Sequence, residues 1–391
     1  MPGVSYFITR DYEALSASSL ALQLNADASG EVILYNGKSD VTWSVDILGR
    51  MIVDLLNPPQ VESWPTHPDA NPPGQVRALT YTDRLMVKRL GDGTGVDPML
   101  VLSQVVTTYP DNPELPDLVE EAIVAGNRVF AAFRAEDAKR FMADEIAGTT
   151  LAAGYHHQEN SRPATNVQQF GVEFLSFNAN ATGIATRTLR TFIWTIDGDG
   201  ALVVRFANGD KSTITRYSQD NIASQTLVLG TLADDTATIV GHELVEYDGA
   251  SEFSEVMLMN RRYRALHAIN GDDMDAFDFL YLPSGDGCRI TIYDGQQSFA
   301  DIDWWSTAAN TMDSWRYHPI DPTVPLRRRA WELIAIETGT FGDRYWVIEN
   351  LETNGNFDPQ FPWQDPATAP GRINAYEFIQ DLTGQAGPCA Q

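Results

Sequence analysis

The chain has 391 residues, of which 43% are hydrophobic and 20% are charged. This composition is globular, and the length predicts two or three domains rather than a single core. Aspartate and glutamate total 53 against 27 for lysine and arginine, so the net charge is −26. Such a charge disfavours nucleic acid and anionic membrane surfaces as partners.

No run approaches the ~20 apolar residues of a membrane-spanning helix, so we expect no membrane insertion of this chain. Met1-Pro-Gly does not begin a signal peptide. If the protein is exported, we expect its signal or anchor to lie outside this sequence.

One pattern occurs twice. The sequence LQLNADASG at 22–30 matches LSFNANATG at 175–183, position by position. Trp43-Ser-Val-Asp46 then matches Trp194-Thr-Ile-Asp197. Each of the stretches 20–55 and 172–206 reads as three strands joined by two turns, so one supersecondary unit is used at least twice. We expect Trp43 and Trp194 to be equivalent and largely buried.

Strands and turns dominate the rest of the chain. A proline-rich stretch between 58 and 73 predicts a long loop, because proline cannot sit in a central strand. We predict a first β repeat at 1–110, a linker with a short helix at 111–126, a second β repeat at 127–258, and a β-rich C-terminal domain at 259–391. In the C-terminal domain FDFLYLPSGDGCRITIYDG (277–295), followed by Trp304, loosely repeats the shared pattern and suggests a third copy.

Short strands separated by turn clusters predict an all-β fold, either tandem antiparallel β-barrels or β-sandwiches with a few short helices. The Asn/Asp-rich turn, its glycine and the W-x-[VI]-D strand resemble the lipocalin-like β-barrel repeats of exported bacterial proteins. The resemblance implies ligand carriage, surface attachment or an envelope role, and a protein partner of unknown kind.

The two cysteines, Cys288 and Cys389, could form a disulfide that holds the C-terminal tail, as suits an oxidising compartment. Two free thiols are the alternative. Their separation and the absence of a CxxC motif make metal binding by these residues improbable.

The C-terminal third is the candidate functional region. Six of the nine tryptophans lie there, at positions 304, 305, 315, 331, 346 and 363. Trp304 and Trp305 are adjacent and must face opposite ways on a strand, so one ring should be exposed or covered by a loop. Exposed rings beside carboxylates are typical of sugar-binding or glycan-cleaving clefts. Packing in the core is the alternative for these tryptophans. The candidate ligand-binding residues are Trp304, Trp305, Asp301, Asp303, Trp315 and Arg316.

Two further stretches contain candidate ligand-binding residues. Arg327-Arg328-Arg329 could clamp an anionic ligand, although such a run more often pairs with neighbouring carboxylates. The run Glu352–Asp358 has the alternating oxygen spacing of calcium loops, which makes Asn354, Asn356 and Asp358 candidate Ca²⁺ ligands. A plain turn-rich loop is the alternative there, because the glycine falls at the fourth position and Pro359 follows.

These observations predict a non-enzymatic protein, exported to the cell surface or periplasm, that binds a glycan or a small apolar ligand. The alternative is a polysaccharide-active enzyme or carbohydrate-binding module that uses the tryptophan-rich third. An enzyme would need two carboxyl groups roughly 5–10 Å apart in a cleft, which a binding module does not require.

Overall fold

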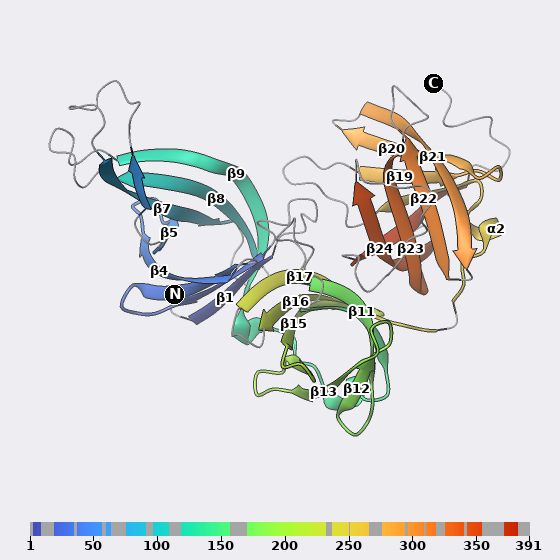
Figure 1. Ribbon diagram of the computed structural model, residues 1–391, viewed down its shortest axis with the longest axis horizontal. Coiled ribbons are helices and arrows are strands. Elements are labelled where there is room, and N and C mark those ends of the chain that lie inside the picture. Colours follow the sequence, from blue (N-terminus) through green and yellow to red (C-terminus); the bar gives the residue numbers. More distant parts are fainter. Residues whose placement is uncertain are drawn as a thin grey trace. The chain divides into compact units, whose positions relative to one another are not determined.

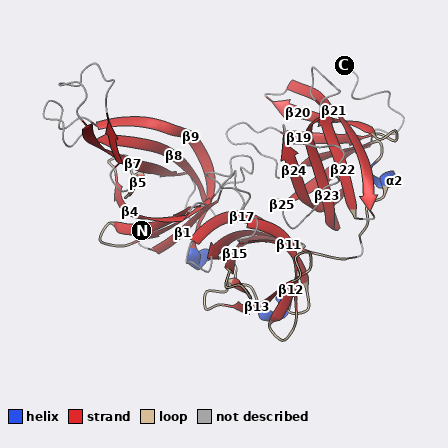
Figure 2. Ribbon diagram, in the orientation of Figure 1, coloured by secondary structure: helices blue, strands red, loops and turns tan. Residues whose placement is uncertain are grey.

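The structure is a computed structural model, and it describes residues 3–8, 19–34, 37–56, 60–63, 76–90, 97–108, 119–156, 170–231, 237–249, 251–265, 276–293, 296–308, 310–317, 325–339, 342–353 and 371–381. Among the described residues strands dominate, with two single-turn α-helices and one short 3-10 segment, so the predicted all-β class is confirmed (Figure 2). None of the helices in the described ranges has the length and apolar character needed to cross a membrane.

The strands form three sheets in chain order, coloured blue to cyan, green to yellow, and orange to red in Figure 1. Contacts divide the chain into two compact units, one with the first sheet and one with the second and third. Every strand pairing within the sheets is antiparallel, which fits strands connected in sequence by turns.

The first sheet has the strand order β5-β4-β3-β2-β1-β9-β8-β7-β6, and an additional β5–β7 pairing joins its two sides into a ring. We call this ring barrel 1. Its strands are β1 (Gly3–Ile8), β2 (Ser19–Leu24), β3 (Ser29–Leu34), β4 (Gly37–Val45), β5 (Met51–Leu55), β6 (Gln60–Ser63), β7 (Val76–Arg89), β8 (Asp97–Thr108) and β9 (Val119–Arg134).

Barrel 2 is closed by eight strands. A 3-10 turn η2 (Ala135–Asp137) and the helix α1 (Ala143–Ile146) precede it. Its strands are β10 (Thr150–His156), β11 (Phe170–Phe177), β12 (Thr182–Ala185), β13 (Arg190–Ile196), β14 (Leu202–Phe206), β15 (Lys211–Asp220), β16 (Ala223–Thr231) and β17 (Ala237–Glu246).

Barrel 3 is also closed by eight strands and follows the helix α2 (Glu255–Leu258). Its strands are β18 (Arg261–Ala265), β19 (Ala276–Tyr281), β20 (Asp286–Tyr293), β21 (Gln296–Ala308), β22 (Thr311–Tyr317), β23 (Pro325–Thr338), β24 (Asp343–Thr353) and β25 (Gly371–Asp381).

Each barrel has its own apolar interior, because alternate residues of every strand point inward. In β13, for example, Phe192 and Trp194 are buried while Ile193 is exposed. Barrel 3 is filled mainly by aromatic rings, including Tyr263, Phe279 and Trp331. Large side chains of this kind fill the interior that eight strands enclose.

A turn with the same kind of indole hydrogen bond occurs in all three barrels, at the positions where the sequence pattern recurs. The indole N–H of Trp43 donates to the Asn25 carbonyl at 3.0 Å, and that of Trp194 donates to the Asn178 carbonyl at 3.2 Å. In barrel 3 the indole of Trp304 donates to the carbonyl of Leu282 at 3.0 Å. As predicted, Trp194 is buried, but Trp43 is only half-buried.

One predicted element is wrong. Residues 119–125, part of the linker at 111–126 where a short helix was expected, are instead the first part of strand β9, which pairs with β8 over most of its length and with β1 at its end. The strand runs to Arg134, so barrel 1 extends beyond the boundary expected at residue 127. A strand of this length can hydrogen-bond both neighbours, which an isolated helical turn cannot do.

Barrels 2 and 3 pack against each other within one unit. Their shared apolar cluster includes Phe174 and Val245 from barrel 2 and Ile334, Trp346 and Ile348 from barrel 3. Polar contacts at its edge join Arg187 to Glu332 at 3.0 Å and Asn221 to Glu337 at 2.8 Å. The outer walls of the two barrels therefore bury apolar surface together.

Candidate functional site: an arginine-lined cavity in the third barrel

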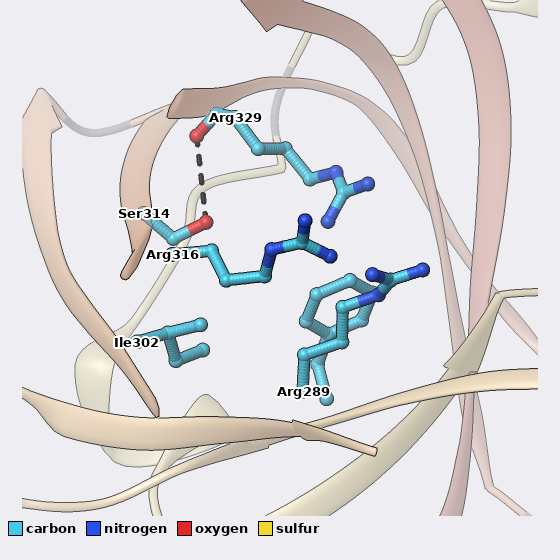
Figure 3. A pocket seen from close by; sticks show the side chains of 6 residues that line it. Arg289, Ile302, Ser314, Arg316 and Arg329 are labelled. Atoms are coloured by element: carbon cyan, nitrogen blue, oxygen red, sulfur yellow. Dashed lines mark hydrogen bonds between the residues drawn. The ribbon is translucent and has the colours of Figure 1, made fainter. Parts of the chain in front are cut away.

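A small cavity of about 10 Å³, room for about one water-sized group, lies inside barrel 3. Figure 3 shows three arginine side chains reaching into it from three different strands. Its described lining consists of Phe279, Arg289, Ile302, Ser314, Arg316 and Arg329. We call this space the arginine cavity.

Strand alternation explains why these arginines point inward. Cys288 and Ile290 pack in a separate apolar cluster, so Arg289 between them takes the opposite face of β20. On β23, Arg329 lies two residues before Trp331, which is part of the barrel core.

Arg329 has a buried acidic partner. Its guanidinium lies 2.9 Å from the carboxylate of Glu349, which is fully buried. The indole N–H of Trp331 donates to the same carboxylate at 3.1 Å, and the hydroxyl of Tyr376 donates to it through a short hydrogen bond. The Arg329 guanidinium also lies 4.7 Å from the centre of the Phe279 ring. These contacts hold one cation of the cavity in a fixed position.

A buried hydroxyl lies among the same groups. Tyr281 is fully buried, and its hydroxyl has no hydrogen-bond partner among the described residues. Burial raises the pKa of Tyr281 well above its usual value, and the charges of Arg329 and Glu349 also act on it. The phenol therefore stays protonated and is a hydrogen-bond donor inside the barrel.

The arrangement favours a small anion as ligand. Guanidinium groups donate several hydrogen bonds in a planar fork that matches carboxylate, phosphate or sulfate oxygens. The cavity is far smaller than the ~300–1,000 Å³ of cavities that hold drug-sized molecules, so it takes only a very small group. Since aromatic side chains fill the rest of the interior, the apolar ligand expected from the sequence has less support than an anion.

The structure separates the predicted ligand-binding residues. Trp304 is buried in the core, and its indole N–H donates to the carbonyls of Leu282 and Asp286. Trp304 is therefore a core residue, and no single surface combines all six predicted side chains. Arg316 lines the arginine cavity. Trp305 and Trp315 lie edge to face, 5.3 Å apart, and both are half-buried.

The predicted carboxylates lie next to this tryptophan pair along the sheet. Asp303 pairs in register with Trp315 and accepts a 2.6 Å hydrogen bond from the hydroxyl of Tyr317, while Asp301 is exposed. Burial, with this hydrogen bond, raises the pKa of Tyr317 to about 12. We call Asp303, Trp305, Trp315 and Tyr317 the aromatic face.

Two arginines of the Arg327–Arg329 run pair with neighbouring carboxylates. Arg328 forms a two-point ion pair with Asp313, with nitrogen–oxygen distances of 2.9 and 3.3 Å. Arg329 pairs with Glu349 but also lines the arginine cavity. The pairing interpretation therefore holds for Arg328 and Arg329, and the anion-clamp interpretation stays a prediction.

Several predictions fall wholly or partly outside the described residues. Asn354, Asn356 and Asp358, the candidate calcium ligands, lie there. Within the described ranges, no group of three or more histidine, cysteine, aspartate or glutamate side chains is placed to hold a metal ion. Cys288 is buried and disulfide-bonded. Since Cys389 is also outside the described residues, the pairing of the two cysteines stays a prediction.

Sequence reasoning missed Arg289, Phe279 and Ser314 as lining residues of this cavity. An available signal was the isolated arginine of CRITIY, at an inward position of an otherwise apolar strand. A buried arginine needs polar partners, so its position on the inward face was informative. No protein-family model matches the chain, and none of the curated proteins compared with it matches.

Proposed function

We propose that this is a non-catalytic binding protein whose third barrel holds a small oxyanion, such as a phosphate, sulfate or carboxylate group. The observation that carries the proposal is the convergence of Arg289, Arg316 and Arg329 on one interior cavity.

The protein as a whole carries a net charge of −26, so non-specific attraction of anions to its surface is weak. Binding therefore depends on the local groups in the cavity. An interior site also excludes water, which strengthens charge-assisted hydrogen bonds.

We further propose that the protein acts outside the cytosol, at a cell surface or in a periplasm. The disulfide at Cys288 supports this location, because structural disulfides persist in oxidising compartments and are rare in reducing ones.

Isothermal titration of the intact protein with inorganic phosphate and with sulfate tests the oxyanion proposal. Ionic strength is held constant with chloride, and methyl phosphate and acetate serve as further probes. We expect saturable binding, and we expect Arg316→Gln to weaken it by about tenfold or more, since a charge-assisted hydrogen bond contributes roughly 1.5–3 kcal/mol.

The matched control is Arg264→Gln. Arg264 lies on β18 of the same barrel and pairs with Asp278 outside the cavity. It should leave the affinity unchanged. No saturable binding of any of these anions, or equal weakening by the two substitutions, would refute an oxyanion site in the cavity.

Glycan binding at the aromatic face is the second candidate function. It is favoured by the partly exposed Trp305 and Trp315 and by the Asp303 carboxylate, which Tyr317 holds in place. Aromatic rings contact sugar faces, and fixed carboxylates orient hydroxyl groups.

A glycan array probed with wild type, Trp305→Ala and Trp304→Phe separates the glycan hypothesis from core packing. Trp304 faces the interior, so its substitution should leave any glycan signal unchanged, whereas Trp305→Ala should abolish it. If wild type binds no glycan, or Trp305→Ala binds as well as wild type, the aromatic face is not a sugar site.

A further inference from the structure

The turn between β14 and β15 contains an asparagine followed by a glycine. Two backbone hydrogen bonds close it, from the N–H of Phe206 to the carbonyl of Asp210 at 2.9 Å and from the N–H of Gly209 to the carbonyl of Phe206 at 3.0 Å. Gly209 takes the left-handed conformation in this turn, with φ of 97°. Asn208 and Gly209 are both exposed, so water reaches the peptide bond between them.

Asp210 holds the side chain of Asn208 over that peptide bond. The backbone N–H of Asp210 donates to Oδ1 of Asn208 at 3.3 Å, and Nδ2 of Asn208 donates to the Asp210 carboxylate at 2.7 Å. Hydrogen bonds from an asparagine side chain to the residue two positions later are those of an Asx turn. The side chain is therefore folded back, with its carbonyl carbon Cγ beside the backbone nitrogen of Gly209.

An asparagine held in this way can react with the next backbone nitrogen. When the surface turn opens locally, the nitrogen of Gly209 leaves its hydrogen bond to Phe206, forms a bond to Cγ of Asn208 and gives its proton to solvent base. The Cγ–Nδ2 bond breaks, and the departing nitrogen takes a proton from water and leaves as ammonia. Water then opens the cyclic imide at either carbonyl, which gives aspartate or its β-linked isomer, isoaspartate. The net reaction consumes water and releases ammonia, with no change in oxidation state.

A second Asx turn in the same barrel differs at the residue that reacts. Oδ1 of Asn180 accepts a hydrogen bond from the backbone N–H of Thr182 at 3.3 Å, and Asn180 is exposed. The intervening residue is Ala181, which is also left-handed, with φ of 62°. The two asparagines thus share exposure and the same side-chain hydrogen bond. The Cβ of Ala181 hinders closure of the imide ring, whereas glycine has no Cβ.

The reaction at Asn208 would remove a hydrogen-bond donor from a buried carboxylate. Asp210 is fully buried, and the Arg190 guanidinium lies 3.4 Å from the oxygen that accepts from Asn208. The other oxygen of Asp210 has no hydrogen-bond partner among the described residues. A carboxylate at position 208 only accepts hydrogen bonds, so it would remove the shorter contact and place two like charges together.

We propose that Asn208 is a site of self-catalysed deamidation, and that the product weakens the end of barrel 2 at which β14 and β15 meet. The reacting groups are the side-chain amide of Asn208 and the backbone nitrogen of Gly209, and water is the only co-reactant. Asn180 does not react at a comparable rate.

Peptide mapping of the intact protein by mass spectrometry tests the reaction. The protein is kept at neutral pH and sampled over time, together with the free peptide FANGDKS, which has the sequence of residues 206–212. We expect Asn208 to become a mixture of aspartate and isoaspartate at least about tenfold faster than Asn180 of the same molecules, because only Gly209 leaves the ring-closing path open.

Thermal unfolding tests the effect on barrel 2. We expect Asn208→Asp to lower the midpoint by about 2–6 °C, since it leaves a buried carboxylate without its donor. The matched control is Asn180→Asp, which should leave the midpoint unchanged. Barrel 1 already has an aspartate at that position of the repeated turn, where the carboxylate of Asp27 accepts hydrogen bonds from the backbone N–H and the hydroxyl of Ser29. If Asn208→Asp does not fold, wild type before and after deamidation gives the same comparison.

Two results would overturn the modification site. The first is an intact protein whose Asn208 is unchanged when the free peptide has reacted completely. The second is equal conversion at Asn208 and Asn180. An Asn208→Asp variant as stable as wild type, or an equal loss in Asn180→Asp, would overturn the proposed weakening of barrel 2.

Discussion

The buried carboxylate of Glu173 holds the turn between β12 and β13 through hydrogen bonds. Its carboxylate accepts hydrogen bonds from the backbone N–H groups of Phe174, Arg187 and Thr188, at 2.8–2.9 Å. The last two belong to the turn between β12 and β13. One carboxylate thus satisfies several backbone donors that would otherwise be buried without a partner.

Burial raises the pKa of Glu173 above its ordinary value of 4.5, although these hydrogen bonds and Arg187 act in the opposite direction. The folded state therefore holds this proton to a higher pH than the unfolded state does. The contribution of Glu173 to stability is largest at low pH, falls as pH rises above 4.5, and becomes constant once the folded group is ionised.

We predict that Glu173→Gln removes the pH dependence that Glu173 gives to the stability of the protein. The difference in unfolding free energy between wild type and variant should fall from pH 4 towards neutral pH and then level off. Urea denaturation at a series of pH values measures it. A difference that instead increased with pH would show that the hydrogen bonds, rather than burial, dominate the pKa of Glu173.

At the scale of single residues, the sequence predicted which side chains have binding chemistry better than it predicted where those side chains lie in the fold. Arg316 was a predicted ligand-binding residue and does line the arginine cavity. Trp304 was a candidate ring for a ligand, yet it is a core residue that completes the repeated turn. Local sequence cannot tell which of two adjacent tryptophans faces inward, because the answer depends on the register of the whole strand.

The repeated turn is the element that the sequence revealed most clearly. Ala28 and Ala181 occupy the same left-handed position, with φ of 68° and 62°, and Gly285 takes it in barrel 3 with φ of 86°. Two residues later each copy has a glycine with no room for a side chain. A Cβ at Gly183 would lie 2.2 Å from the Phe192 ring and 2.5 Å from the Ser176 carbonyl.

We predict that Gly183→Ala destabilises the protein by ~1–3 kcal/mol through overpacking. Gly198→Ala is the control, because a Cβ there meets nothing within 4 Å, and it should change stability by less than about 0.5 kcal/mol. Chemical denaturation compares the two variants. Equal effects would mean that the close approach of β12 and β13 does not explain this glycine.

The element that the sequence failed to predict is strand β9. The run from Leu118 to Ala125 has a proline and an aspartate before it, as helix starts do. Residues 119–125 take strand conformation because they pair with β8, and the later residues 131–134 of the same strand pair with β1. Tertiary pairing of this kind overrides local helix signals.

For the whole molecule, the apolar cluster between barrels 2 and 3 couples their stabilities. We predict that Ile348→Ala, which removes a fully buried side chain from this cluster, costs ~2–5 kcal/mol. Hydrogen exchange should then become faster in β10 and β17 as well as in β24 and β25. Faster exchange confined to barrel 3 would show that the two barrels unfold independently.

Val32→Ala provides the comparison in the other unit. Val32 is fully buried in the core of barrel 1 and makes no contribution to the shared cluster. Its substitution should accelerate exchange in barrel 1 alone, because contacts place barrel 1 in a separate compact unit.

The disulfide at Cys288 also affects the stability of the whole molecule. We predict that its partner is Cys389, which would close a loop of about a hundred residues and contribute ~4–5 kcal/mol in the chain-entropy model. Titration of thiols in denaturant without reductant should find none. Two reactive thiols per chain would remove the main support for an extracellular or periplasmic location.

The central claim is that the interior of barrel 3 binds an oxyanion, and crystals grown with tungstate test it most directly. Tungsten scatters anomalously, so its position is measured without prior assumptions about the ligand. We predict an anomalous peak within hydrogen-bond distance of Arg289, Arg316 and Arg329, and its loss in Arg316→Gln crystals grown in the same way. Tungstate bound only at the molecular surface, with none in the arginine cavity, would contradict the claim.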